Sequence, residues 1–427
     1  MIRKSIGELS KQVGSNVTIS GFVHSIRNQG KIAFLRVRDV TGSIQVVTGV
    51  WNKEVFASID GLSVESVIQV EGLVKESKQV PEGVEIDATK ITIQSTALPL
   101  PIPVVSEKGA EEVDVTKRFD YRWLDLRKPD SQKIFQVWTV LEQGIREYFT
   151  DNSFTQLYSP ALMSAPSESG AEVFEVKYFE GKAYLAQSPQ FYKQMAIASG
   201  FEKVFMVGPV FRAELSFTTR HMTEFTGWDF EIAHITSHHD VMDTEEAMLK
   251  SGFAKLKSKG LIEEEILVPF ARISLADAKA KLKQAGITSE KVGDLSPDEE
   301  RGICKIVKEE SGSEFVFITD YPKDHRAFYH MRDEETGLTK GFDLLYKGVE
   351  ITTGAQREHR IEKLLAQATE KGLTEEGLSD YLSFFRYGVP PHGGVGIGPG
   401  RIVAQILGLP SVKEATFLPR DVKRLRP

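Results

Sequence analysis

Residues 224–231 have the sequence EFTGWDFE. Side chains alternate between the two faces of a strand. One face therefore carries Phe225, Gly227, Asp229 and Glu231. An aromatic ring, a glycine and two carboxylates make a poor core face and a good floor for a ligand. The stretch predicts one strand of a long β-hairpin over residues 203–233, with a solvated, salt-bridged hairpin as the alternative.

The preceding strand of this hairpin carries charges of its own. Arg212 and Glu214 share a face, and the turn that follows contains Thr218-Thr219-Arg220-His221. On the floor itself, Phe225 and Asp229 would stand roughly 13 Å apart at about 3.4 Å per residue, a separation that fits a nucleotide base at one end and a small amine at the other.

A second polar hairpin is predicted by FDLLYKGVEITTGAQR, residues 342–357. Lys347-Gly348 is suited to a tight turn, and pairing across it brings Asp343 and Glu350 close together. Two carboxylates so placed repel each other unless a cation lies between them, and Mg²⁺ takes one or two carboxylates beside phosphates. Arg357 follows as a bidentate partner for a carboxylate. An ordinary surface hairpin is the alternative.

The glycine-rich run GGVGIGPG, residues 393–400, does not contain the spacing G-x-G-x-x-G. It also lacks a following βαβ unit, so it does not predict a dinucleotide site. The run leads into an apolar helix that Arg401 opens, where backbone N–H groups and a fixed cation favour an anion. A flexible loop before a core helix is the alternative.

Residues 1–104 contain five candidate strands separated by glycines. Five strands in about 100 residues are typical of a small barrel of the OB type. Pro99, Pro101 and Pro103 begin a segment that cannot be regular helix, so residues 105–130 are predicted to be a linker. A helix is predicted from Asp130-Ser131. Dispersed strands and helices over 131–427 predict an α+β domain with an antiparallel sheet flanked by helices.

The composition narrows the class of protein. The chain has 427 residues, a formal net charge of −7 and a single cysteine, Cys304. These values favour a globular protein of two or three domains in a reducing cytoplasm, without a disulfide framework. No apolar run approaches the length of about 18 residues that a membrane span needs.

Several segments together resemble class II aminoacyl-tRNA synthetases, specifically aspartyl-tRNA synthetases of the archaeal and eukaryotic-cytosolic type. The resemblance covers nearly the whole chain. It is carried by RFDYRWLDLR at 118–127, a strand with Pro160 at the family's dimer interface, QSPQFYKQ at 187–194, FRAE at 211–214, RHMTEF at 220–225, EITTGAQR at 350–357 and FLPRDVKRLRP at 417–427.

The resemblance implies a homodimeric ligase that activates L-aspartate with ATP and Mg²⁺ and transfers it to tRNA. It leaves two alternatives for the tRNA substrate, tRNA(Asp) alone or both tRNA(Asp) and tRNA(Asn). It implies Arg212 and Arg401 as catalytic residues. Aspartate would be bound by Glu168, Gln190, Lys193, Arg212, Asp229, Thr353 and Arg357. ATP would be bound by Arg212, Glu214, Arg220, His221, Met222, Phe225, Glu350, Gly398, Gly400 and Arg401. Glu350, Thr353 and Asp343 would hold the metal, and Arg27, Phe34 and Glu85 would contact the anticodon. Residues 252–312 resemble the family's variable insertion, and no chemical role is assigned to them.

Within the resemblance, Lys193 indicates that the substrate is aspartate rather than asparagine. An aspartate side chain needs fixed positive charge, and asparaginyl relatives lack the lysine of the Ser188-Pro189-Gln190 segment. For Phe34, a core aromatic is the alternative to a base-stacking platform.

Two positions depart from the family's pattern. Gly400 stands where relatives carry glutamate, and Ser169 follows Glu168 where glycine is usual. The first departure leaves a catalytically impaired tRNA-binding paralogue as one alternative. The other is an asparagine-forming metabolic ligase on the same core, which the N-terminal barrel disfavours.

Overall fold

A computed structural model describes residues 3–105, 113–164, 173–215 and 218–427. The chain divides into two compact units, Met1–Pro129 and Asp130–Pro427. Across the described ranges, no helix has both the length and the apolar character that crossing a membrane requires.

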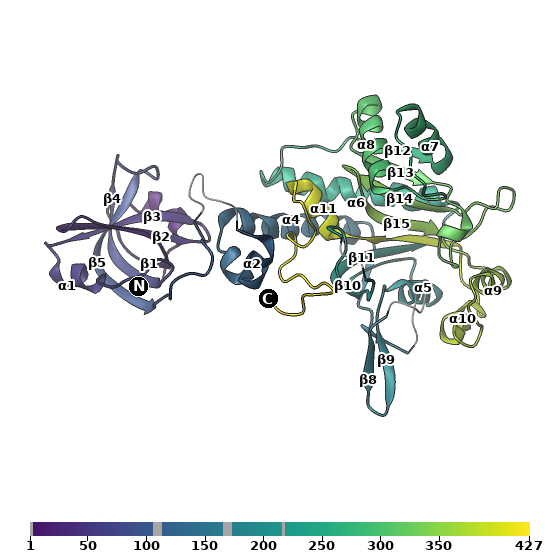
Figure 1. The fold of residues 1–427 in the computed structure, drawn as a ribbon, viewed down its shortest axis with the longest axis horizontal. Helices are drawn as coiled ribbons and strands as arrows, with labels where there is room; N and C mark the ends of the chain where they lie inside the picture. Colours follow the sequence, from purple (N-terminus) through teal and green to yellow (C-terminus); the bar gives the residue numbers. More distant parts are fainter. Residues whose placement is uncertain (1–2, 106–112, 165–172, 216–217) are drawn as a thin grey trace. The chain divides into compact units, whose positions relative to one another are not determined.

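The first unit is built around a closed β-barrel (Figure 1). Its strands are β1 (Asn16–Asn28), β2 (Ile32–Asp39), β3 (Gly42–Gly49), β4 (Val67–Glu76) and β5 (Val84–Ser95). They close in the order β1-β2-β3-β5-β4, with β4 pairing back to β1. Alternate side chains, including Val23, Leu35 and Val46, are fully buried inside the barrel. The five-stranded OB-type prediction is confirmed.

Short helices complete this unit. They are η1 (Ile6–Gln12), α1 (Lys53–Ser58), α2 (Val115–Asp120) and α3 (Arg122–Asp125). The last two lie in the region predicted to be a linker. Asp114 starts α2 because its carboxylate accepts hydrogen bonds from the backbone N–H groups of Thr116 and Lys117, which lack helical partners.

The second unit contains an eight-stranded sheet in the order β12-β13-β14-β15-β16-β11-β10-β6. Its strands are β6 (Thr155–Leu157), β10 (Lys203–Phe211), β11 (Glu224–Ala233), β12 (Ala271–Ser274), β13 (Phe315–Thr319), β14 (Gly341–Tyr346), β15 (Val349–Gln356) and β16 (His392–Ile397). The central pairs are antiparallel, as predicted. The outermost pair at each edge is parallel, so the sheet is mixed rather than wholly antiparallel.

Helices flank this sheet (Figure 1). They are α4 (Pro129–Asp151), α5 (Gln190–Ala198), α6 (His238–Ser258), α7 (Leu275–Gln284), α8 (Pro297–Ser311), η2 (Lys323–His325), α9 (Ile361–Glu370), α10 (Ser379–Phe385) and α11 (Pro399–Leu407). Trp228, Phe230 and Ile232 of β11 pack into one core cluster with residues of α4 and α6. Period-2 alternation therefore leaves the opposite face of β11 for the site.

The predicted hairpin over residues 203–233 is confirmed, since β10 and β11 pair antiparallel along their whole length. The glycine-rich run differs from the flexible loop considered as its alternative. Residues 392–397 form β16, between β11 and β15. Glycine is needed there because a Cβ on Gly394 would lie 2.0 Å from the Phe230 carbonyl oxygen and 2.2 Å from Glu231 Oε2.

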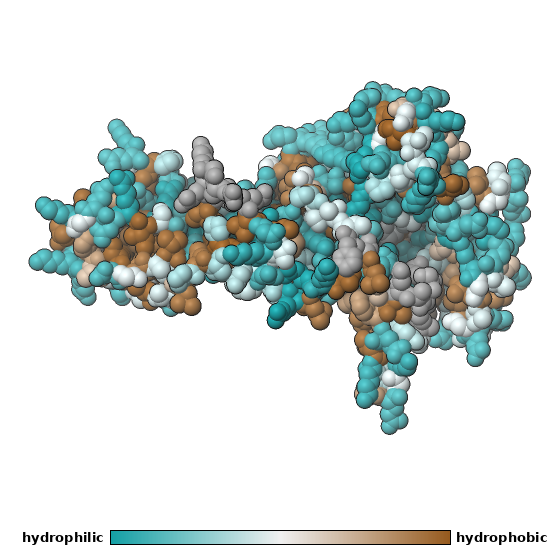
Figure 2. Space-filling model, in the orientation of Figure 1, coloured by the Kyte–Doolittle hydropathy of each residue, from teal (hydrophilic) through white to brown (hydrophobic). Residues whose placement is uncertain are grey.

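The variable insertion is also structured. Residues 252–258 belong to the end of α6, while β12 joins the edge of the main sheet and α7 and α8 follow it. The face in view carries mostly hydrophilic residues around α7 and α8 (Figure 2).

A separate three-stranded sheet contains β7 (Leu162–Met163), β8 (Glu175–Tyr178) and β9 (Gly181–Leu185) in the order β7-β9-β8. The expectation that Pro160 lies in a strand is wrong. Pro160 falls between β6 and β7, where a residue without a backbone N–H costs no ladder hydrogen bond.

Candidate active site

A cavity of about 770 Å³ lies in the second unit. Its walls come from β10, β11, β15 and β16, from Arg212, Glu214 and residues 220–222, and from the start of α11. Most predicted binding residues line it: Gln190, Arg212, Glu214, Arg220, His221, Met222, Phe225, Asp229, Glu350, Thr353, Arg357, Gly398, Gly400 and Arg401. Segments far apart in the sequence thus meet at one cavity of the size typical of ligand sites.

Three predicted residues are placed differently. Lys193 and Asp343 do not line the cavity, and both are almost fully buried. Glu168 lies outside the described residues, as does Ser169.

A buried charge cluster forms the floor beneath the cavity. Lys193 Nζ lies 2.8 Å from Asp229 Oδ2 and 3.4 Å from Glu231 Oε2. Arg357 Nε lies 3.0 Å from Glu231 Oε1. The two cations, from α5 and from the end of β15, therefore share the carboxylate of Glu231. The cluster holds two positive and two negative groups, and Asp229 and Arg357 reach the cavity surface.

The protonation of this cluster follows from burial and pairing. Burial would raise the pKa of the Glu231 carboxyl, but Arg357 and Lys193 together hold it below its ordinary value. Burial raises the pKa of Asp229, with Lys193 opposing the shift. Arg357 Nη1 also lies 3.3 Å from His330 Nε2. Burial and then the Arg357 charge lower the pKa of His330, so the neutral ring accepts this hydrogen bond.

Cations and an aromatic ring lie at the other end of the cavity. The Arg212 guanidinium lies 5.7 Å from the centre of the Phe225 ring, and Arg212 Nη1 lies 3.8 Å from Glu214 Oε1. Arg401 Nη1 donates to the backbone oxygen of Glu350 at 2.8 Å and approaches Glu350 Oε1 at 3.2 Å. A planar ring with arginines nearby suits a flat heterocycle that carries negative charge.

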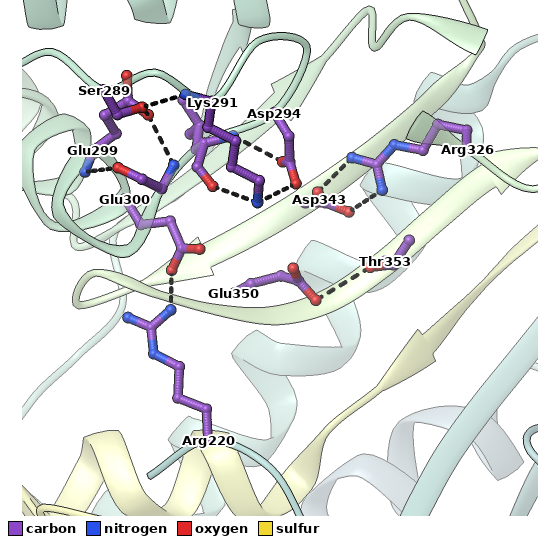
Figure 3. A network of polar contacts seen from close by, with 12 residues as sticks. Arg220, Ser289, Lys291, Asp294, Glu299, Glu300, Arg326, Asp343, Glu350 and Thr353 are labelled. Carbon is purple, nitrogen blue, oxygen red and sulfur yellow. Dashed lines mark hydrogen bonds and ion pairs between the residues drawn. The ribbon is translucent and has the colours of Figure 1, made fainter. Parts of the chain in front are cut away.

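The β14–β15 hairpin turns at Lys347-Gly348, as predicted, and both residues have positive φ. A β-bulge shifts the register, so Asp343 pairs with Thr353 while Glu350 pairs with Leu345. Both oxygens of Asp343 accept hydrogen bonds from Arg326 (Figure 3). Asp343 is thus already paired with a cationic side chain of the protein. The expectation that Asp343 contributes to a metal site is not retained, because Arg326 already neutralises it and it does not line the cavity.

Glu350 and Thr353 lie together on the cavity wall, with Thr353 Oγ1 3.3 Å from Glu350 Oε1 (Figure 3). Among the described residues, no group of three or more His, Cys, Asp or Glu side chains is arranged to hold a metal ion. One carboxylate and one hydroxyl match an ion that obtains most of its ligands from phosphates and water, as Mg²⁺ does.

The three residues predicted to contact the anticodon, Arg27, Phe34 and Glu85, lie on one outer face of the barrel. Arg27 and Phe34 are paired neighbours on β1 and β2. Phe34 is half-buried and absent from the barrel core, which excludes the core-aromatic alternative. Gln45 Nε2 donates to Glu85 Oε2 at 2.7 Å on the neighbouring strands β3 and β5.

Sequence reasoning did not assign Glu231, Arg326 or His330 to the site. The alternation of residues 224–231 places Glu231 on the site face, so its position was predictable although its partners were not. Arg326 and His330 belong to no sequence pattern that indicates their role, because their partners lie on strands that are distant in the sequence.

Comparisons with known proteins agree with this site. The family described as tRNA synthetases class II (D, K and N) matches residues 114–422, and the OB-fold nucleic acid binding domain matches residues 17–94. The chain is 42% identical to the aspartate–tRNA(Asp/Asn) ligase of Aeropyrum pernix over 97% of this chain and 96% of that protein. It is 37% identical to the aspartate–tRNA(Asp) ligase of Pyrococcus furiosus over 97% of each chain.

Two solved structures share the fold. The asparaginyl-tRNA synthetase of Pyrococcus horikoshii, complexed with asparaginyl-adenylate, superposes with a TM-score of 0.91 at 34% identity, covering 100% of both chains. The aspartyl-tRNA synthetase of Entamoeba histolytica has a TM-score of 0.87 at 31% identity, covering 100% of this chain and 93% of that one.

A buried carboxyl behind the cavity generates a testable pH dependence. Glu245 of α6 is fully buried; burial raises its pKa to about 8 from 4.5, with Thr352 opposing the shift and Asp343 adding to it. Between these two values the folded state holds a proton that the unfolded state releases. The contribution of this group to stability therefore falls as pH rises, by at most about 1.4 kcal/mol per pH unit.

We expect Glu245→Gln to gain stability relative to the parent chain as pH rises from 5 to 8, measured as the free energy of chemical unfolding. Glu246→Gln at the next helix position controls for the loss of a carboxylate. A stability difference that stays constant over this range would contradict a protonated Glu245.

Proposed function

Because this chain belongs to the class II tRNA synthetases of the D, K and N group, we propose that it attaches L-aspartate to tRNA(Asp) through an aspartyl-adenylate. The observation that carries the proposal is the buried pair of cations, Lys193 and Arg357, held by one carboxylate beneath the cavity. Fixed positive charge at the end of an amino-acid site favours a substrate whose side chain is an acid.

Aspartate would lie over the floor of the cavity. We propose that Arg357 and Lys193 balance its side-chain carboxylate, while Asp229 and Glu168 meet its α-ammonium group. Gln190 and Thr353 also line the cavity and would complete the polar contacts. Glu231 does not contact the ligand in this arrangement; it fixes the two cations.

ATP would occupy the other end of the cavity. We propose that Phe225 and Arg401 enclose the adenine, that Glu214 meets its edge, and that Arg212 binds the α-phosphate. Arg220, His221 and Met222 would hold the rest of the nucleotide from the β10–β11 loop. Gly398 and Gly400 at the start of α11 would allow close approach of the backbone.

Glu350 and Thr353 would hold Mg²⁺ on the triphosphate. The fit rests on their position side by side on the cavity wall. When bound, the ion neutralises charge on the phosphates and so favours departure of pyrophosphate.

The chemistry requires no covalent bond to the protein. The α-carboxylate of aspartate attacks the α-phosphorus of ATP, a P–O bond forms, and the bond to pyrophosphate breaks. A hydroxyl of the tRNA's terminal ribose then attacks the aspartyl carbonyl carbon and AMP leaves. Arg212 would stabilise the negative charge that develops at phosphorus, Arg401 would hold the adenine in place, and the cavity would hold the reactants in line.

Gly400 lacks the carboxylate that relatives carry, but its backbone and its surroundings are ordinary. It is not among the glycines with positive φ, and a Cβ there would meet Trp138 Cζ2 at 3.6 Å, an ordinary contact. The neighbouring Arg401 and the distant Arg212, Glu350 and Arg357 all line the cavity. We therefore propose an active enzyme, which ATP–pyrophosphate exchange with aspartate tests directly.

We propose a homodimer in the cytoplasm as the working form. Tyr158 and Leu162, on either side of Pro160, are 78% and 45% exposed apolar side chains. Exposed apolar residues grouped in one segment suit burial against a second copy.

The role of Lys193 gives the first test of this function. Replacing Lys193 with Leu removes one cation and leaves Asp229 and Glu231 dependent on Arg357 alone. We expect aspartate-dependent ATP–pyrophosphate exchange to fall by about 100-fold or more, since a buried charge-assisted contact is worth about 2–5 kcal/mol. Thermal melting and ATP binding of the variant control for misfolding, and unchanged exchange would refute the assignment.

The outer face of the barrel gives a second test. Phe34→Ala removes a stacking platform, which contributes about 1–3 kcal/mol per base. We expect kcat/KM for aminoacylation of tRNA(Asp) to fall about tenfold or more. Pyrophosphate exchange, which needs no tRNA, stays unchanged and serves as the internal control. Equal loss of both activities would show that Phe34 acts through folding.

The range of tRNA substrates is tested separately. Relatives named for both tRNA(Asp) and tRNA(Asn) occur beside relatives named for tRNA(Asp) alone. We propose that this chain charges both, and expect aspartylation of tRNA(Asn) and tRNA(Asp) transcripts with kcat/KM values within about tenfold, because an anticodon surface that accepts both tRNAs avoids the cost of about 1–3 kcal/mol that a wrong contact at one base would impose. A tRNA with an unrelated anticodon is the control, and charging of tRNA(Asp) alone would contradict this part.

A further inference from the structure

Helix α8 of the insertion packs directly against the hairpin that carries Glu350. A Cβ on Gly348 would lie 2.8 Å from Arg301 Cγ and 3.0 Å from Arg301 Cα. The turn of the β14–β15 hairpin therefore has glycine where α8 crosses it. Lys347, the other turn residue, bonds to Glu264 at 2.9 Å from the opposite end of the insertion.

The insertion also contacts the loop between β10 and β11. Arg220 Nη1 forms an ion pair with Glu300 Oε2 of α8 (Figure 3). Arg220 Nη2 donates to the backbone oxygen of Gly348 at 3.1 Å. The Arg220 and Glu300 side chains are only 19% and 11% exposed. One guanidinium thus joins the loop, the insertion helix and the hairpin turn.

Glu300 and Gly348 contact Arg220 on the side away from the cavity. Arg220 lines the cavity, whereas Glu300 and Gly348 do not. A guanidinium has five N–H donors in a rigid plane, so two contacts on one edge leave others for a ligand on the cavity side. A partly buried ion pair is also weakly screened by solvent and keeps the guanidinium in one orientation.

Glu299, the neighbouring acid on α8, does not contact Arg220. Glu299 accepts hydrogen bonds from Lys279 at 2.8 Å and Ser289 at 2.6 Å, both within the insertion. Adjacent acids of the same helix therefore have different partners, and only Glu300 reaches the wall of the cavity through Arg220.

We propose that Glu300 is a positioning residue that aims Arg220 at the triphosphate of bound ATP. The inference rests on the proposed ATP site and gives the insertion a role in it. Glu300 touches no substrate; it acts by fixing the orientation of Arg220 before the nucleotide binds, which lowers the entropic cost of binding. If Glu300 instead competes with phosphate for Arg220, removing its charge would improve ATP binding, and the test below distinguishes this outcome.

The test is the ATP dependence of pyrophosphate exchange. We expect Glu300→Gln to raise KM for ATP about five- to tenfold, because a hydrogen bond to a charged group is weakened, with kcat and KM for aspartate changed less than twofold. Glu300→Asp should restore part of the effect. Asp298→Asn removes a carboxylate from the same helix that pairs with Arg301, and should leave all three constants unchanged.

A double-mutant cycle distinguishes positioning from a loosened insertion. If Glu300 acts through Arg220, adding Glu300→Gln to Arg220→Ala produces no further rise in KM for ATP. Additive effects, no effect of Glu300→Gln, or a lower KM for ATP would each overturn the inference. Absence of aspartate-dependent exchange in the parent chain would instead overturn the proposed function.

Discussion

The carboxylate of Glu231 is the constraint on which the site depends. It is fully buried and lies between Lys193 and Arg357. An ionised carboxylate without its partners would cost several kcal/mol in such a place, so both cations have to be present. One comes from α5 and the other follows β15, and the requirement therefore ties a helix to the centre of the sheet. Gly394 follows from the same constraint, because a larger residue would overlap Glu231.

The choice of substrate depends on this charge cluster rather than on the fold. The asparaginyl and aspartyl enzymes with solved structures share this chain's architecture over its full length, so the architecture does not select between an acid and an amide. The selection is local and electrostatic. In the proposed arrangement, Arg357 and Lys193 balance the acidic side chain of the substrate and Asp229 meets its α-ammonium group, so charges of opposite sign face both ends of the substrate.

The insertion shows how a peripheral segment can contribute to a site that it does not line. Helix α8 contacts the Gly348 turn and, through Glu300, the guanidinium of Arg220. Both belong to segments that face the proposed triphosphate. Packing of this kind limits the freedom of loop residues, and it does so from the side away from the ligand, where it leaves the cavity open.

Local patterns in the sequence were sufficient for the two hairpins and for the face of β11 that carries site residues. Alternation in residues 224–231 and the turn at Lys347-Gly348 are local properties, so both hairpins were predictable from the residues alone, and the family resemblance supplied the ligand. Only the tertiary structure decided which charges meet. Arg326 neutralises Asp343, and Lys193 lies beneath the cavity rather than on its surface, because these contacts join segments whose approach depends on sheet order and register.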